Sequence, residues 1–252
     1  MHIDIDRFSS LKSPIHNWDP RCKIVSLMIL IFCISMVKSI EIALFGSVFS
    51  YIIVHVSKIP DKYILKRITV PLLFLLPLFL FLPVSSGGRI LIDLNIIRIY
   101  SNGVYLSFLI ITKALSIIIL FIIMLGTSTF NQTAMALKSL KLPSKLVNML
   151  LFTYRYIFVY LEDLRKMRIA LTQRGYRSRN SVKSLRSTGN LIGTLLIRSF
   201  EQTDRIYNAM ILRGFTNQIP HQNEFKLLKS DILKSIFILL VAIFLVIWEV
   251  FI

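Results

Sequence analysis

Acidic residues are scarce in this chain, and they are missing where an ion-driven carrier would need them. The 252 residues include 13 Asp and Glu against 30 Lys and Arg, which gives a net charge of +17. The first four apolar runs contain no Asp or Glu in their interiors. Carriers driven by protons or sodium usually place carboxylates in the middle of the membrane. The sequence therefore disfavours an ion-coupled carrier.

The residues of several other kinds of site are also missing. The two cysteines, Cys22 and Cys33, lie in or beside the first apolar run, so we expect neither a disulfide framework nor a zinc site. His55 has no His or Cys at ligand spacing, so we expect a packed or interfacial histidine. There is no Gly-x-x-x-x-Gly-Lys-Ser/Thr loop for ATP, and no Ser/His/Asp or Cys/His triad can be assembled. We expect no metal site, no cofactor and no enzymatic activity.

Long apolar runs, by contrast, are abundant. Hydrophobic residues make up 55% of the chain, and the mean hydropathy is +0.68. A membrane-spanning helix needs roughly 20 predominantly apolar residues. The sequence predicts an all-α integral membrane protein with about five transmembrane helices, at Cys22–Val37, Ile42–Val56, Ile68–Val84, Val104–Gly126 and Ile232–Ile252.

Some features within and between these runs predict local structure. Three prolines interrupt Ile68–Val84, and a bend is expected there. Lys113 lies inside the fourth run and must face protein or extend to the membrane surface, because a charge in hydrocarbon is costly. Residues 38–41 are short enough for a tight helical hairpin, and residues 89–101 predict a small hairpin or loop.

Basic loops predict the orientation of the spans. The polar residues 1–22 include Trp18 and Arg21, and with Lys23 they suit a segment that lies at the membrane interface. The loop at 58–67 is also rich in Lys and Arg. Positively charged loops stay on the cytoplasmic side. We therefore expect a multi-pass protein of the cell membrane with a cytoplasmic N-terminus.

Residues 127–230 differ from the flanking regions 1–126 and 231–252, and we expect them to be cytoplasmic. Between positions 138 and 234 there are 18 Lys and Arg against six Asp and Glu. Steps of three and four residues predict a long helix that begins near Pro143 and packs lengthwise on another helix. Its stripe is Leu150, Thr153, Ile157, Tyr160, Leu164, Met167 and Leu171. A second helix, roughly Leu185–Arg213, places Ile192, Leu195, Leu196, Ser199, Ile206 and Met210 on one side.

Both long helices end in the same pattern. Residues 162–176 and 201–215 match at an offset of 39 residues, and both finish on Arg-Gly-aromatic. Glycine accepts the left-handed conformation that commonly ends a helix. The repeat therefore predicts two helix ends, each of which presents one arginine, Arg174 or Arg213.

The doubled Ala-x-x-x-Arg-Gly pattern, at 170–175 and 209–214, resembles the coupling motifs of the transmembrane (T) component of energy-coupling factor transporters, the CbiQ/EcfT family. Residues 13–23, Ser-Pro-Ile-His-Asn-Trp-Asp-Pro-Arg-Cys-Lys, are similar to an N-terminal motif of that family. Leu142-Pro143 followed by residues 151–156 fits as well. The resemblance covers essentially the whole chain.

This resemblance implies two long cytoplasmic coupling helices between the fourth and fifth spans. It also implies partners: two ABC ATPase subunits that bind the arginines, and a substrate-binding S component in the membrane. A guanidinium pairs bidentately with a carboxylate and stays charged when it is desolvated, and the aromatic that follows can fill an apolar pocket beside it. Carried over by position, the coupling residues are Gln173, Arg174, Gly175, Leu212, Arg213 and Gly214, supported by Ala170, Ala209, Tyr176 and Phe215. Gln173 and Leu212 stand where the family commonly has alanine.

The substrate that the resemblance implies is a Co²⁺ or Ni²⁺ ion or a vitamin. The acidic-Arg-aromatic run at 3–8 favours the metal-ion branch of the family. An alternative function is that of an integral-membrane enzyme that binds an anionic lipid through its basic region. Nucleic acid is not an expected partner, because the basic residues lack interleaved aromatics for base stacking and the positive-inside bias explains them.

Overall fold

The chain forms two compact units in the computed structural model, which describes residues 11, 13–87, 90–93, 98–176, 181–215 and 227–251. The first unit, here called the membrane unit, comprises Met1–Ala136 and Phe225–Ile252. The second, here called the paired-helix unit, comprises Leu137–Glu224. The acidic-Arg-aromatic run at 3–8 lies outside the described residues.

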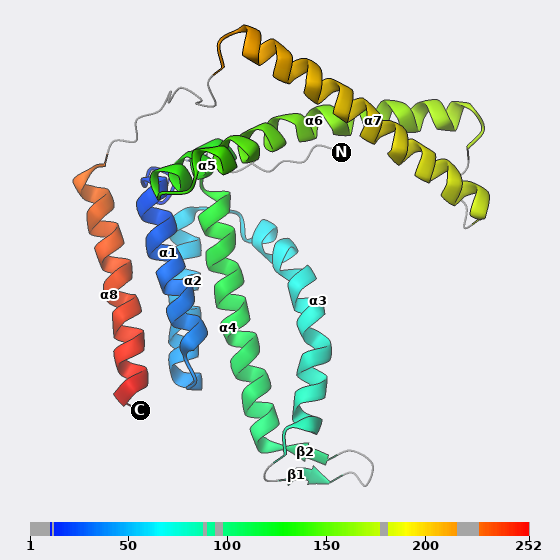
Figure 1. Cartoon of the computed structure of the whole chain (residues 1–252). Helices are drawn as coiled ribbons and strands as arrows, with labels where there is room; N and C mark the ends of the chain where they lie inside the picture. Colours follow the sequence, from blue (N-terminus) through cyan, green and yellow to red (C-terminus); the bar gives the residue numbers. More distant parts are fainter. Residues whose placement is uncertain are drawn as a thin grey trace. The chain divides into compact units, whose positions relative to one another are not determined.

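The membrane unit is built from long apolar helices (Figure 1). Four of them are long and apolar enough to cross a membrane. A fifth, α1, has 17 residues, the lower limit for a span. The chain is therefore an all-α membrane protein, as predicted. The helices are α1 (Pro20–Met36), α2 (Ile40–Ser57), α3 (Asp61–Ser85), α4 (Ser101–Gly126) and α8 (Lys229–Phe251).

Two further features complete the path of the chain. The antiparallel pair of β1 (Ile90–Asp93) and β2 (Arg98–Tyr100) connects α3 to α4, which confirms the small hairpin expected at 89–101. The short helix α5 (Phe130–Ser139) follows α4, and no element was predicted there. Its N-terminus is closed by a reciprocal capping box, in which Thr129 N donates to Gln132 Oε1 and Gln132 N donates to Thr129 Oγ1.

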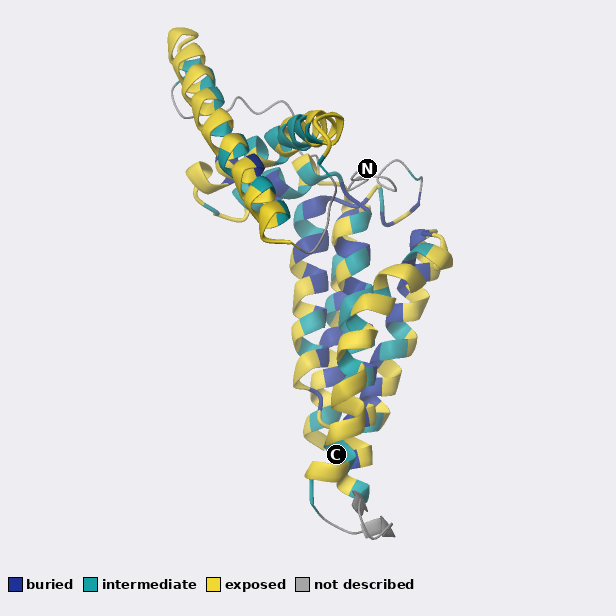
Figure 2. Ribbon diagram, turned by 90° about the vertical axis from the view of Figure 1, so that its right-hand side faces the viewer, coloured by how far each residue is buried: buried dark blue, intermediate teal, exposed yellow. Residues whose placement is uncertain are grey.

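The core of the membrane unit lies along α1. This helix packs against α4 and α8, and α4 in turn packs against α2 and α3. Leu27 and Leu30 of α1, Leu120 of α4 and Leu245 of α8 are fully buried in this core. The outer sides of the helices are exposed (yellow in Figure 2) and carry large apolar side chains. Such faces suit contact with lipid or with another membrane protein.

The α3–α4 contact is unusually close. Gly103 of α4 faces the backbone of Leu82 and Pro83, and a Cβ atom on Gly103 would lie 2.6 Å from the Cα of Pro83. Only glycine permits this approach. The three prolines lie inside α3, and the helix bends, as expected (Figure 1).

Side chains of α4 and α8 hold the turn between α1 and α2. The Glu249 carboxylate accepts hydrogen bonds from Lys38 N (2.8 Å), Ser39 N (3.4 Å) and Ser39 Oγ (2.9 Å). Lys113 donates from Nζ to the Val37 carbonyl at 2.5 Å, which confirms that this lysine faces protein. Tyr105 accepts a hydrogen bond from Ile40 N through its hydroxyl. The turn is therefore fixed by contacts from two helices that lie far away in the sequence.

The segment before α1 packs into the membrane unit. Trp18 is 3% exposed and Lys23 is 0% exposed, so both side chains face protein. Both are buried because each finds hydrogen-bond acceptors inside the membrane unit. Asp19 caps α1 by accepting a hydrogen bond from Arg21 N at 2.8 Å, and Pro20 occupies the first helical position.

The paired-helix unit consists of α6 (Ser144–Gln173) and α7 (Val182–Leu212), close to the predicted bounds. The predicted stripe on α6 is half correct. Tyr160, Leu164, Met167 and Leu171 are partly buried, whereas Leu150, Thr153 and Ile157 are exposed. In that first half, Val147 and Asn148 are buried, and Phe152 and Tyr156 are partly buried. Asn148, Phe152 and Tyr156 line a cavity that faces α7. On α7, Leu195, Ser199, Ile206 and Met210 are partly buried as predicted, and Ile192 and Leu196 are exposed.

Candidate coupling site

The first predicted coupling motif forms the C-terminal cap of α6. Gly175 has φ +82°, the left-handed conformation. Its N–H donates to Thr172 O at 3.0 Å, and the N–H of Tyr176 donates to Leu171 O at 3.1 Å. These two bonds define a Schellman motif, which satisfies the last carbonyls of a helix. Arg174 is the cap residue itself.

The second motif repeats this geometry at the end of α7. Gly214 has φ +79° and donates from its N–H to Ile211 O at 2.9 Å. The N–H of Phe215 donates to Met210 O at 3.0 Å, and Arg213 is the cap residue. The doubled sequence pattern therefore folds into two helix ends with the same backbone, as the placement of the glycines predicts.

The residues at both tips are exposed, and Arg174 also lines a groove between α6 and α7. Arg174 and Arg213 are exposed, and so are Gln173 and Leu212, the residues that precede them. Leu212 is 88% exposed, which is unusual for a large apolar side chain. Within the described part of the chain, neither guanidinium forms an ion pair. The remaining predicted residues of the motifs, Ala170 and Ala209, are exposed as well.

The two aromatic residues each contact the opposite helix of the same unit. The hydroxyl of Tyr176 bonds Ser184 Oγ and Thr188 Oγ1 of α7, each at 2.9 Å. The ring of Phe215 lies 6.4 Å from the ring of Phe152 of α6, edge-on. Each aromatic thus anchors its Arg-Gly end to the opposite helix, because a half-buried ring gains more from this packing than from exposure.

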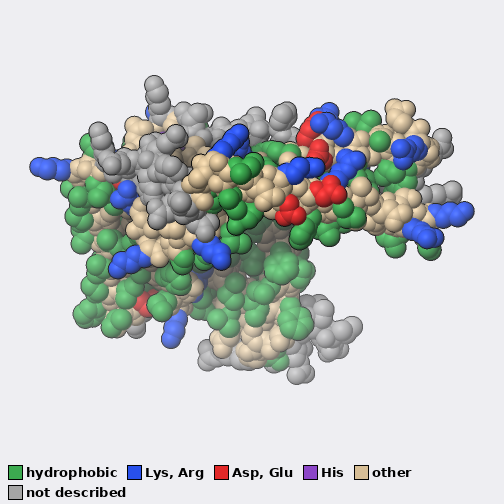
Figure 3. Space-filling view, turned by 45° about the horizontal axis from the view of Figure 1, so that its top comes forward, with side chains coloured by type: hydrophobic (Ala, Val, Ile, Leu, Met, Phe, Trp, Pro, Cys, Tyr) green, Lys and Arg blue, Asp and Glu red, His purple; other side chains and the backbone are tan. Residues whose placement is uncertain are grey.

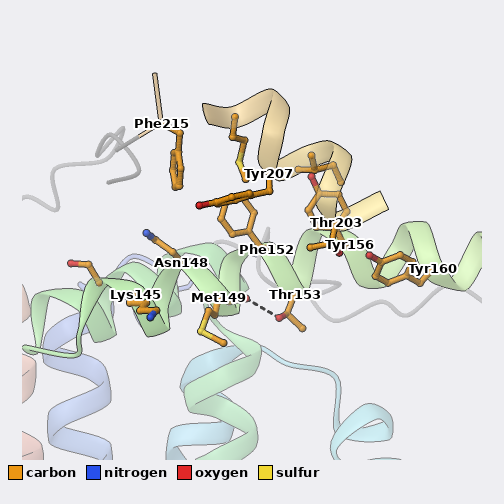
Figure 4. Close-up of a pocket in the computed structure, with 13 residues that line it drawn as sticks. Lys145, Asn148, Met149, Phe152, Thr153, Tyr156, Tyr160, Thr203, Tyr207 and Phe215 are labelled. Atoms are coloured by element: carbon orange, nitrogen blue, oxygen red, sulfur yellow. Dashed lines mark hydrogen bonds between the residues drawn. The ribbon is translucent and has the colours of Figure 1, made fainter. Parts of the chain in front are cut away.

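The helices α6 and α7 cross with an aromatic cavity between them (Figure 4). The cavity has a volume of about 660 Å³ and is lined by Phe152, Tyr156 and Tyr160 of α6, by Tyr207 of α7 and by Phe215. Tyr160 also donates from its hydroxyl to Ser199 O at 3.4 Å. Sequence periodicity did not predict the cavity, because periodicity shows which residues share a helix face and not how two helices cross.

Charge on the paired-helix unit is mixed rather than uniformly basic. Figure 3 shows acidic and basic side chains close together along the long helices. The pair Glu162–Lys166 has an N–O distance of 3.9 Å, with both side chains more than half exposed. Such a pair contributes little to stability. The described residues contain no cluster of three or more His, Cys, Asp or Glu that could hold a metal ion.

The fold and the two helix ends define a class: a multi-pass membrane protein with a pair of long polar helices that present two equivalent Arg-Gly tips. A model of the CbiQ family, described as cobalt transport protein, matches residues 11–225. The chain therefore belongs to the CbiQ family, and it is a membrane component of a transporter.

Individual relatives point the same way. An uncharacterized protein of Methanocaldococcus jannaschii is 23% identical over 98% of this chain and 87% of its own length. The energy-coupling factor transporter transmembrane protein EcfT of Macrococcus caseolyticus is 28% identical over 84% of each chain. The EcfT protein of Staphylococcus aureus is 27% identical over 84% of this chain and 83% of its own. The chain is thus similar to EcfT proteins over most of its length.

Proposed function

We propose that this chain is the coupling subunit of an energy-coupling factor importer, with two ABC ATPase subunits and a membrane-embedded S component as partners. Its own role is mechanical, and it catalyses no reaction. The observation that carries this proposal is the identical geometry of the two Arg-Gly tips. Two equivalent tips suit two equivalent ATPase subunits.

The chemistry of the tips supports an ion pair with each ATPase. Arg174 and Arg213 present planar guanidinium groups that are exposed and have no ion-pair partner within the described part of the chain. A guanidinium binds a carboxylate through two parallel hydrogen bonds and keeps its charge when it is buried in an interface. When ATP closes the ATPase dimer, the two tips are drawn together. The long helices α6 and α7 then carry that movement towards the S component.

The proposal places the paired-helix unit and the N-terminus in the cytoplasm. The excess of Lys and Arg in residues 138–234 and in the loop at 58–67 supports this orientation, because basic loops are retained on the cytoplasmic side. ATPases that bind the tips are cytoplasmic by necessity, since that is where ATP is found.

The test is affinity purification of the tagged chain after co-expression with the ATPases and S component of its own source. The wild type is expected to retain two ATPase chains, and Arg174→Ala with Arg213→Ala is expected to retain none. Arg165→Ala with Arg205→Ala is a matched control, because both residues are exposed cations, one on α6 and one on α7, about two turns before the tip of their own helix. Full assembly and transport by the double arginine variant would refute the assignment of the tips. A phospholipid-converting activity of the purified chain alone would contradict the mechanical role.

The favoured substrate is a Co²⁺ or Ni²⁺ ion, and the description of the matching family as cobalt transport proteins supports this choice. Cells that express the whole complex are expected to accumulate radioactive Co²⁺ or Ni²⁺ in an ATP-dependent manner. If the cells take up a labelled vitamin and neither metal ion, the substrate is a vitamin. That result would leave the proposed coupling role unchanged.

A further inference from the structure

Lys23 forms an internal link between two distant parts of the membrane unit. Its side chain is completely buried at the start of α1. The ammonium group donates to Thr127 Oγ1 at 2.9 Å and lies 3.4 Å from Thr127 O and 3.5 Å from Ile15 O. A buried ammonium is tolerated only when its donors are satisfied, and its loss leaves those acceptors unpaired. Lys23 therefore ties α1 to Thr127, at the end of α4.

Trp18 and Pro14 make a second link, to the start of α8. The indole N–H of Trp18 donates to Asp231 O at 3.1 Å, and both residues are almost fully buried. Lys234, one turn further along α8, donates to Pro14 O at 3.0 Å and lies 3.5 Å from the Asp231 carboxylate. The same short segment, residues 13–23, thus contacts both Thr127 and Asp231, which are more than 100 residues apart in the sequence.

These two residues flank the paired-helix unit in the sequence. Thr127 lies ten residues before the paired-helix unit begins at Leu137, and Asp231 lies six residues after the chain returns at Phe225. Residues 13–23 therefore hold the membrane unit on both sides of the inserted pair of helices. Closely packed, hydrogen-bonded interiors transmit displacement because they deform little.

We propose that Trp18, Lys23, Thr127 and Asp231 form a joint that transmits movement of the paired-helix unit to the membrane helices. Trp18 and Lys23 are its positioning residues. This inference rests on the proposed coupling function. Without the joint, movement at either connection is absorbed locally, and α1 stays in place when the ATPases close.

The chain carries its own reporter for this joint. Its only two cysteines are Cys22, directly before Lys23, and Cys33, further along α1. Both are free thiols and partly exposed. Cys22 lies against Ser235 of α8, so its access to a reagent depends on the packing of α1 on α8. Cys33 is away from the joint and serves as an internal control.

The experiment measures the rate of maleimide labelling of each cysteine, by peptide mass spectrometry, in the full complex in lipid nanodiscs. Labelling is compared without nucleotide and with ADP and vanadate. The wild type is expected to show a several-fold change at Cys22 and no change at Cys33. Lys23→Met is expected to abolish the change at Cys22, and Trp18→Phe, which removes only the N–H donor, is expected to reduce it. Lys62→Met, an exposed lysine at the start of α3, is expected to behave like the wild type.

The outcomes separate the joint from the proposed function. If the ATPases co-purify with the wild type but the labelling rate of Cys22 is the same with and without nucleotide, the joint is refuted and the proposed function is not. A preserved nucleotide response in Lys23→Met would also overturn it, because a purely structural lysine lowers the melting temperature without removing the response. If Lys23→Met does not fold, the same criteria apply to Trp18→Phe. A wild type that isolates without ATPases refutes the proposed function itself.

Discussion

Gly175 and Gly214 are the residues on which the shape of each tip depends. Both have positive φ, and in both cases nothing lies within 4 Å of the position that a Cβ would take. The requirement for glycine is therefore conformational and not steric. The backbone reversal at these glycines exposes the arginine before them and returns the aromatic after them to the opposite helix.

Replacing either of these glycines with alanine is expected to weaken the tip without unfolding the protein. A left-handed alanine costs about 1 kcal/mol more than glycine, and asparagine is expected to cost less. Amide hydrogen exchange at Tyr176 in Gly175→Ala, or at Phe215 in Gly214→Ala, should accelerate roughly fivefold. Unchanged exchange in both variants would show that the caps do not hold these ends.

Gly103 is predicted to be intolerant of substitution for the opposite reason, lack of space. A Cβ there collides with the backbone of Leu82 and Pro83, which cannot move as a side chain does. Gly103→Ala is expected to lower the free energy of unfolding by about 1–3 kcal/mol, the usual cost of overpacking. Thermal unfolding in detergent measures this.

Gly189 of α7 provides a matched control for Gly103. It lies inside a helix, and no atom lies within 4 Å of the position of its absent Cβ. Gly189→Ala is expected to stabilise the chain by up to about 1 kcal/mol, since alanine favours helix. Equal effects of the two substitutions would contradict the close α3–α4 contact.

At the scale of elements, α8 closes the membrane unit by contacts at both of its ends. Asp231 and Lys234 meet the segment before α1, and Glu249 meets the turn between α1 and α2. The last helix of the chain is thereby attached to the first hairpin. The paired-helix unit is inserted into the sequence between two parts that pack on each other.

Glu249→Ala is expected to loosen this closure. It removes three hydrogen bonds to Lys38 and Ser39, and a hydrogen bond to a charged group contributes about 1.5–3 kcal/mol. The control is Glu41→Ala. Glu41 is exposed in the first turn of α2, so this substitution also removes one negative charge close to the same turn. The melting temperature should fall for Glu249→Ala and stay near the wild-type value for Glu41→Ala. An equal fall in both would show that charge, and not the contacts, is what matters.

The sequence predicted elements better than it predicted contacts between them. The apolar runs located the membrane helices, and the two glycines located the ends of α6 and α7. The helix α5 was missed although Thr129 and Gln132 have the spacing of a capping box. The stripe on α6 was misplaced near its start because two neighbouring stripes satisfy the same spacing of three and four residues.

Contacts between residues that are far apart in the sequence could not be predicted, for a physical reason. A lysine next to an apolar run suits a membrane interface, and nothing local to Lys23 shows that its acceptor is Thr127, 104 residues away. The same holds for Trp18 and Asp231. The candidate tips, in contrast, are local structures whose backbone is set by a few consecutive residues, so the sequence was sufficient for their geometry.

At the scale of the whole molecule, the chain combines a membrane unit with a polar helical pair that ends in two arginines. It belongs to the CbiQ family, and we propose that its two tips bind ATPase subunits. The central claim is that these tips are the sites of contact. Gln173 and Leu212 are suitable positions to test it, because both are exposed and each directly precedes an arginine.

The most direct measurement is photo-cross-linking in the assembled complex. A benzophenone amino acid is placed at position 173, at position 212 or, as a control, at the exposed Phe200 in the middle of α7. The first two positions are each expected to cross-link to an ATPase subunit, and position 200 is not. Absence of an ATPase adduct from both tips, or an equal yield from position 200, would show that the tips are not the sites of contact.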